Sequence, residues 1–136
     1  MHARAEGAKC CHLIWMTHRG RSWFKIAATA RFCEQAVRHA CNALGWMLEV
    51  VVVLPDRVQI LLVAPAREDR RTVSHRLREV TTQLLMDANV VPKGVEPVWD
   101  DDGWCAVLPN AVAHAAVRRV LRERKAQYGA GNEPLS

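Results

Sequence analysis

Two long polar side chains, Arg57 and Gln59, interrupt an otherwise apolar stretch at residues 50–65. Pro55 and Asp56 divide this stretch into two runs, which predicts a tight antiparallel hairpin. Residues at i and i+2 of a strand point to the same face, so we expect Arg57 and Gln59 side by side. A guanidinium there can contact a phosphate, but it has no lone pair with which to bind a metal ion. The alternative is that Arg57 pairs with Asp56 or reaches solvent.

Basic charge is the second feature that bears on chemistry. The 136 residues carry a net charge of +5, and most of the 19 Lys and Arg residues are Arg. Arginine suits bidentate phosphate contacts and stacking on bases, so nucleic acid is the first partner to consider. A basic surface without a partner is the alternative. The candidate nucleic-acid contacts lie in a basic loop, on the hairpin and on two predicted helices: Arg19, Arg21, Trp23, Arg57, Arg76, Arg118, Arg119 and Arg122.

Trp23 is the best stacking candidate because it lies in the basic loop. We expect the other tryptophans in the core: Trp15, Trp46, Trp99 and Trp104.

The five cysteines predict neither disulfides nor a metal site. Their number is odd and the sequence holds no C-x-x-C pair. Cys10, Cys11 and His12 are consecutive, but strand alternation sends neighbours to opposite faces. We therefore expect the cysteines to pack as small apolar side chains, and no cofactor or metal to bind.

Three further groups of reactive residues have ordinary structural interpretations. Asp100, Asp101 and Asp102 predict a solvated acidic turn. His114 is expected at the surface or the edge of the core. The only tyrosine, Tyr128, is expected to pack or fray at a helix end.

Hydrophobic periodicity defines the elements that must position these residues. It predicts strands at 10–17, 46–54, 58–64 and 103–108, and helices at 26–44, 67–87 and 111–127. Gly45 is a stop for the first helix, and Asn110 is an N-cap for the last. Inward positions of the first helix include Phe32. A β-α-β-β-α-β-α order predicts an α+β fold, a ferredoxin-like antiparallel sheet with helices packed on it.

The domain organisation is simple. We expect a flexible arm at residues 1–9, one domain at 10–128 and a disordered tail at 129–136. The N-terminus lacks an apolar signal core and no long apolar window follows, so we expect a cytoplasmic protein without membrane contact.

Several strings, in this order along residues 10–128, carry a family resemblance. They are C-H-L-I-W-M-T-H-R-G-R, L-P-D-R-V-Q-I-L-L-V-A-P, Trp99 with Gly103-Trp104, and the spacing of Val117, Val120, Leu121 and Arg124. Together they resemble the single-tyrosine HUH transposases of the insertion-sequence 200-like type, including their repeat-associated relatives. The Pro-Asp hairpin is the most specific of these strings. The resemblance implies an HUH-transposase-like fold, a DNA partner and a homodimer.

The resemblance also implies a catalytic set that this chain lacks. In such transposases two hairpin histidines bind Mg²⁺ or Mn²⁺, a helix tyrosine attacks the phosphate and a glutamine completes the metal coordination. The matching positions here hold Arg57, Gln59, Val120 and Arg124. We therefore predict a transposase-like protein that binds single-stranded or hairpin DNA through its Arg-rich helices without cleaving it. The alternatives are an interaction protein that dimerises with or inhibits an active transposase subunit and, last, an enzyme with a redesigned site.

Overall fold

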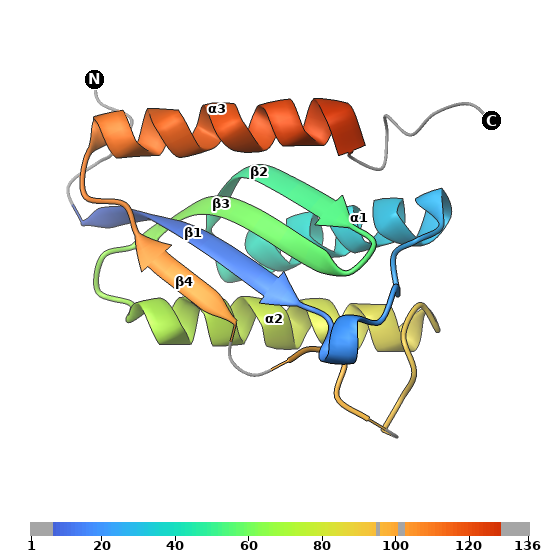
Figure 1. The fold of residues 1–136 in the computed structure, drawn as a ribbon. Helices are drawn as coiled ribbons and strands as arrows, with labels where there is room; N and C mark the ends of the chain where they lie inside the picture. The colour runs from blue at the N-terminus through green and yellow to red at the C-terminus, as the bar shows by residue number, and fades with distance from the viewer. Residues whose placement is uncertain (1–6, 95, 101–102, 129–136) are drawn as a thin grey trace.

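The computed structural model describes residues 7–94, 96–100 and 103–128, which form one sheet and its covering helices. In chain order the elements are β1 (Ala8–Met16), the short helix η1 (His18–Gly20), α1 (Ala27–Leu44), β2 (Met47–Leu54), β3 (Arg57–Pro65), α2 (Arg70–Asp87), β4 (Trp104–Val107) and α3 (Ala111–Tyr128). The strands lie in the order β2-β3-β1-β4, and each neighbouring pair is antiparallel (Figure 1). This arrangement confirms the predicted α+β, ferredoxin-like fold.

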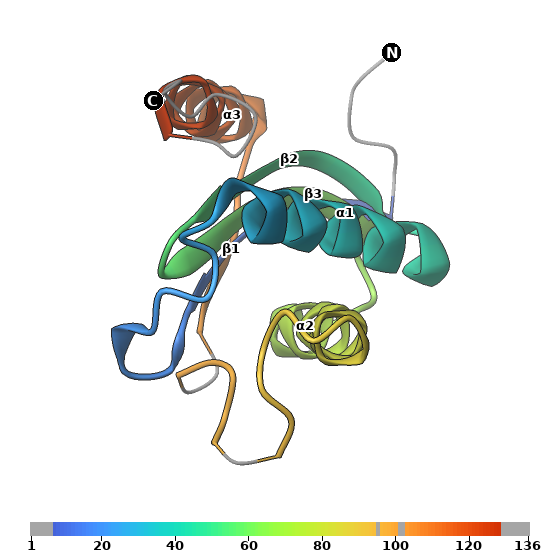
Figure 2. The same ribbon diagram turned by 90° about the vertical axis from the view of Figure 1, so that its right-hand side faces the viewer.

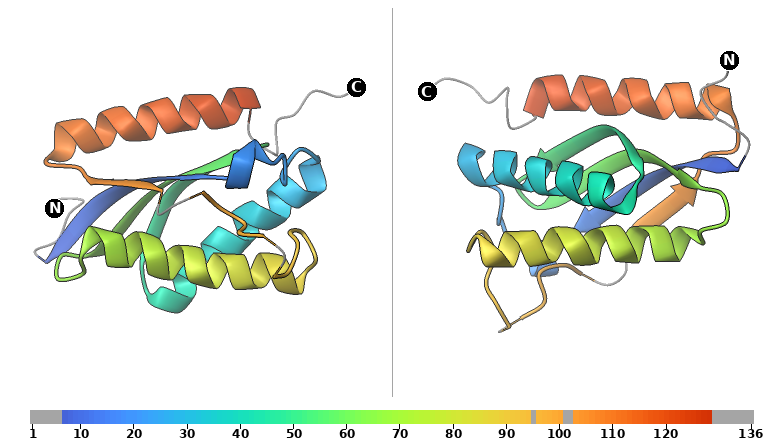
Figure 3. Two further views of the ribbon diagram at one scale, coloured as in Figure 1. Left: turned by 60° about the horizontal axis from the view of Figure 1, so that its bottom comes forward. Right: turned by 180° about the vertical axis from the view of Figure 1, so that it is seen from behind.

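Helices cover both faces of the sheet. Helices α1 and α2 lie on one face and α3 lies on the other (Figures 2 and 3). None of the described helices combines the length and the apolar character that crossing a membrane requires.

The hairpin of β2 and β3 is largely apolar because both of its faces are covered. Pro55 and Asp56 form the turn, and the register pairs Leu54 with Arg57 and Val53 with Val58. Strands buried on both faces have continuous apolar sequences rather than alternating ones. Arg57 and Gln59 belong to the face that α3 covers, because Leu61 on that face packs in the same cluster as Leu121 of α3.

Two apolar clusters, one on each side of the sheet, hold the layers together. The larger cluster joins the sheet to α1 and α2 and includes Leu13, Trp15 and Leu77. The smaller cluster lies under α3 and consists of Cys10, Val50, Val52, Leu61, Leu108 and Leu121. Helix α3 therefore rests on a small core.

The predicted boundaries are close, and their deviations have local causes. Strand β1 begins at Ala8, which pairs with Pro65, so the arm predicted at residues 1–9 ends before Ala8. Helix α2 begins at Arg70 because the Asp69 carboxylate accepts a hydrogen bond from the backbone N–H of Arg71 at 3.2 Å. Residues 1–6, Asp101, Asp102 and the predicted tail at 129–136 lie outside the described residues.

Two burial predictions are wrong. Phe32 is 36% exposed, and Cys33 next to it takes the inward position of α1. Trp104 is 49% exposed on the edge strand β4. The other tryptophans predicted in the core, Trp15, Trp46 and Trp99, are buried as expected.

Candidate nucleic-acid interface

The polar pair on the hairpin is occupied by contacts within the protein. Gln59 is 5% exposed, and its Oε1 accepts a hydrogen bond from Nη1 of Arg124 on α3 at 3.0 Å. Arg57 donates from Nε to Oδ1 of Asp56 at 3.0 Å, and this contact lowers the pKa of the Asp56 carboxyl. The pairing of Arg57 with Asp56 is therefore the alternative that the structure adopts. The space between the hairpin strand and α3 is filled by the Gln59 and Arg124 side chains.

The helix position that matches the transposase nucleophile points partly to solvent. Val120 is 48% exposed, whereas its neighbour Leu121 is buried in the cluster under α3. Tyr128 is 64% exposed at the end of the same helix. A valine side chain has no group that can attack a phosphate.

His12 on β1 lies close to this polar pair. Burial, followed by the positive charge of Arg124, lowers the pKa of His12. Among the described residues its buried Nε2 atom has no hydrogen-bond partner. The imidazole packs edge to face against Trp104, with 5.0 Å between the ring centroids and 84° between the planes. The imidazole therefore lies against Trp104, where burial and the charge of Arg124 both disfavour its protonation.

A groove of about 880 Å³ lies between α2 and β4. One wall carries Arg70, Arg71, His75 and Arg78 from α2, and the other is β4. The half-exposed ring of Trp104 lies on the opposite face of β4, the face that α3 covers, because Trp104 pairs with Ile14 and packs on His12. None of the described residues that line the groove is acidic; the remaining ones are Thr72, Ser74, Gly103, Cys105 and Ala106. The groove is thus a basic surface beside an edge strand whose other face carries an accessible aromatic ring.

Gly103 permits the close approach of the chain beside this groove. Its φ is +79°, and a Cβ atom at this position would lie 2.9 Å from the carbonyl oxygen of Ile14. A side chain here would push β4 away from β1. Gly103 therefore fixes the wall on which Trp104 sits.

The structure does not bring the candidate contacts predicted from the sequence onto one surface. Arg76 is on α2 and Arg118, Arg119 and Arg122 are on α3, on opposite sides of the sheet (Figure 3). Arg19, on η1, is exposed, as are Arg119 and Arg122.

Several of those candidates already have partners within the chain. Arg21 pairs with Glu96 at 3.2 Å, and Arg76 pairs with Glu68 at 3.3 Å. Trp23 is partly buried, and its Nε1 donates to the carbonyl oxygen of Val98 at 3.0 Å. Arg118 lies 3.5 Å from Glu49. The groove residues Arg70, Arg71 and Arg78 were not among the contacts predicted from the sequence.

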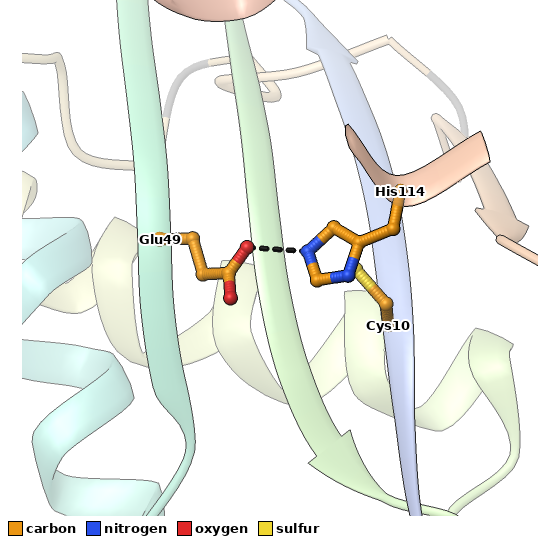
Figure 4. Close-up of side chains that lie close together, drawn as sticks. All are labelled: Cys10, Glu49 and His114. Carbon is orange, nitrogen blue, oxygen red and sulfur yellow. Dashed lines mark hydrogen bonds and ion pairs between the residues drawn. The ribbon is translucent and has the colours of Figure 1, made fainter. Parts of the chain in front are cut away.

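A second polar cluster lies under the first turn of α3, and sequence reasoning missed it. Figure 4 shows His114 between Glu49 and Cys10, which come from α3, β2 and β1. His114 is 3% exposed, and its Nε2 lies 2.5 Å from Oε1 of Glu49. One potential ligand atom from each of the three side chains lies within 4.8 Å of the other two. His114 is therefore a buried, partnered residue rather than one at the surface.

The sequence matches no protein-family model and no curated protein. Solved structures do match the fold. A REP-associated tyrosine transposase bound to a REP hairpin superposes with a TM-score of 0.65 at 13% identity, over 93% of this chain and 72% of the other. A Deinococcus radiodurans R1 protein described as a transposase superposes with a TM-score of 0.63 at 17% identity, over 95% and 97% of the two chains. At these identities the likeness shows a shared fold.

Proposed function

We propose that this chain is a DNA-binding protein with a transposase-like fold, which binds single-stranded or hairpin DNA and does not cleave it. The observation that carries the proposal is the groove that gathers Arg70, Arg71, His75 and Arg78 along the edge strand β4, whose other face carries the exposed ring of Trp104. The fold neighbour with a bound REP hairpin supports a hairpin as the first probe.

The chemistry of the groove suits an unpaired nucleotide. Guanidinium groups bind phosphate oxygens, and an exposed indole offers a stacking surface that every base can use. A volume of about 880 Å³ lies within the range of pockets that hold small organic ligands, roughly 300–1,000 Å³. A strand whose phosphates follow the first two turns of α2 satisfies both requirements if it crosses the edge strand β4 and stacks a base on Trp104 at the other face of that strand.

Lack of cleavage follows from the residues that replace the expected catalytic set. The Gln59 carboxamide is engaged by Arg124, and the always-charged Arg124 guanidinium repels a metal ion at this position. Val120 cannot form a covalent bond with DNA. A strand that binds this protein is therefore released unchanged.

Fluorescence anisotropy with a labelled DNA hairpin and a labelled single strand tests binding. The double variant Arg70→Ala/Arg71→Ala removes two exposed groove charges, and Arg31→Ala/Arg38→Ala removes two exposed charges from α1. We expect the groove variant to weaken binding more than the control variant. If both groove arginines contact phosphates, the slope of log K against log salt falls by about 1.4 to 1.8. Equal losses in the two variants would contradict binding in the groove, and equal affinity for an RNA hairpin would contradict a preference for DNA.

A cleavage assay tests the second half of the proposal. The protein is incubated with labelled single-stranded and hairpin DNA in Mg²⁺ or Mn²⁺ and then run on a denaturing gel. We expect intact DNA and no covalent protein–DNA adduct. An adduct that survives denaturation would overturn the proposal.

A second candidate function, an interaction protein that pairs with a copy of this fold, is favoured by the outer face of α3. Val112 is 79% exposed and Val120 is 48% exposed, with the exposed Ala116 between them at helical spacing. Light scattering on the protein and on the double variant Val112→Ser/Val120→Ser measures the oligomeric state directly. A dimer that becomes a monomer in the variant, together with no salt-dependent DNA affinity, would favour this function over the first.

A further inference from the structure

Cys10, Glu49 and His114 come from three elements and meet between the sheet and the N-terminal part of α3 (Figure 4). Cys10 is fully buried, and the side chains of His114 and Glu49 are 4% and 17% exposed. Arg118, one turn later on α3, lies above them with Nη2 3.1 Å from His114 Nε2. A thiol, an imidazole and a carboxylate are thus gathered in a largely buried place.

The hydrogen bonds around His114 conflict with one another. A ring nitrogen has a single position in the ring plane, which holds either a proton or a lone pair. Arg118 can only donate, so its contact requires a lone pair on Nε2, whereas the Glu49 contact at 2.5 Å requires a proton on Nε2 or on Glu49. A cation bound to both the nitrogen lone pair and the carboxylate would remove this conflict.

We propose that Cys10, Glu49 and His114 form a binding site for a borderline-soft divalent transition-metal ion, with Zn²⁺ as the expected occupant. Thiolate sulfur, imidazole nitrogen and carboxylate oxygen are the three donor types that zinc uses in proteins. Ligands at about 2.0–2.3 Å from a tetrahedral ion lie roughly 3.3–3.7 Å apart. The donor atoms here already lie within 4.8 Å of one another, so side-chain shifts of about 1 Å complete the site.

The fourth ligand can come from solvent. Glu49 reaches the solvent edge, so a water molecule can occupy the remaining position. Arg118 now provides the positive charge beside Glu49 and His114, and its side chain is 31% exposed. The ion replaces this charge when the guanidinium turns outward.

The consequence is mechanical. His114 belongs to α3, whereas Cys10 and Glu49 belong to the sheet, so the bound ion fastens the helix to the sheet over the small cluster of apolar residues. Arg124 follows His114 by ten residues, about 15 Å along the helix at 1.5 Å per residue. The site is therefore distinct from the Gln59–Arg124 pair.

Cobalt substitution and thermal unfolding test the site on the full chain. Co²⁺ added to metal-stripped protein should give a thiolate-to-cobalt absorption band that saturates at one equivalent and disappears on addition of Zn²⁺. Zn²⁺ at about 100 times its Kd should raise the Tm by roughly 6–12 °C, and Mg²⁺ at the same concentration should not. Absence of the cobalt band and of the zinc-dependent Tm shift would overturn the proposal.

Variants assign the ligands. Cys10→Ser and Glu49→Gln should each weaken Zn²⁺ binding by at least about 10- to 100-fold, and Cys10→Ser should abolish the thiolate band. Cys105→Ser is the matched control, because Cys105 lies on the other face of the sheet and should leave the band and the affinity unchanged. Far-UV circular dichroism shows whether each variant is folded, and Glu49→Gln keeps the test decisive if Cys10→Ser does not fold. A band that persists in Cys10→Ser, or that disappears in Cys105→Ser, would contradict this ligand set.

Discussion

Nη1 of Arg124 on α3 donates a hydrogen bond to Oε1 of the buried Gln59 on β3, at 3.0 Å. This bond joins the helix to the strand through side chains that replace a glutamine and a histidine of the resembling transposases. Helix α3 is therefore held on the sheet by a polar contact as well as by the small apolar cluster.

The first prediction concerns the strength of that contact. Arg124→Ala leaves the Gln59 carboxamide buried without its partner, and we expect a loss of about 1–3 kcal/mol in the free energy of unfolding. In the double variant Arg124→Ala/Gln59→Leu both polar groups are absent, so its loss should be smaller than the sum of the losses in Arg124→Ala and Gln59→Leu. Urea unfolding of the four proteins measures both effects. Additive losses would show that the two side chains are not coupled.

The second prediction concerns Gly103. Gly103→Ala places a Cβ atom 2.9 Å from the carbonyl oxygen of Ile14 and also strains a backbone with φ of +79°. Gly45→Ala is the matched control, because Gly45 has φ of +77° but nothing within 4 Å of the added carbon. We expect Gly103→Ala to destabilise the protein by about 1–3 kcal/mol more than Gly45→Ala. Similar chemical unfolding midpoints for the two variants would argue against the clash.

The local sequence was sufficient to predict the elements and their order. The two apolar runs around Pro55-Asp56 determine the hairpin, and Asn110 caps α3, with its Oδ1 accepting from the N–H of Ala113 at 2.9 Å. Phe32 was assigned wrongly because both it and Cys33 fit an apolar helical stripe, and only packing against the sheet decides between them.

The sites depend on contacts between distant residues, which periodicity does not reveal. Cys10 and His114 meet only because β1 and α3 are brought together by the sheet, and a single histidine gives no spacing signal. Likewise, β4 lies opposite the α2 arginines because it pairs with β1 at the sheet edge. Arg57 and Asp56, by contrast, are adjacent in the chain, so their pairing could be given as an alternative from the sequence alone.

The third prediction is a pH dependence caused by His12. Its pKa in the folded protein is lowered from the ordinary value of 6.5, first by burial and then by Arg124, so the unfolded chain binds the proton more tightly. Stability should therefore increase as the pH rises from the lowered pKa through about 6.5, and should level off above it. Unfolding midpoints between about pH 5 and 7.5 should change less in His12→Phe than in the unmodified protein, with the exposed His39→Phe as control. An NMR titration in which the His12 imidazole titrates at or above 6.5 would contradict this account.

The fourth prediction separates the binding role of Trp104 from a structural one. Trp104 is 49% exposed on the edge strand beside the groove, whereas Trp99 is 7% exposed and donates from Nε1 to Oγ1 of Thr82 at 2.8 Å. Trp104→Ala should weaken single-stranded DNA binding by about 5- to 150-fold, the equivalent of 1–3 kcal/mol for one stacked base.

The free energy of unfolding distinguishes the exposed Trp104 from the buried Trp99. Trp104→Ala should change the free energy of unfolding much less than Trp99→Ala, which should cost about 3–5 kcal/mol because it opens a cavity in the core. Trp104→Phe keeps an aromatic face and should recover most of the affinity for DNA. If Trp104→Ala binds DNA as tightly as the unmodified protein, the base does not stack on this ring, and the groove between α2 and β4 acts through its charges alone.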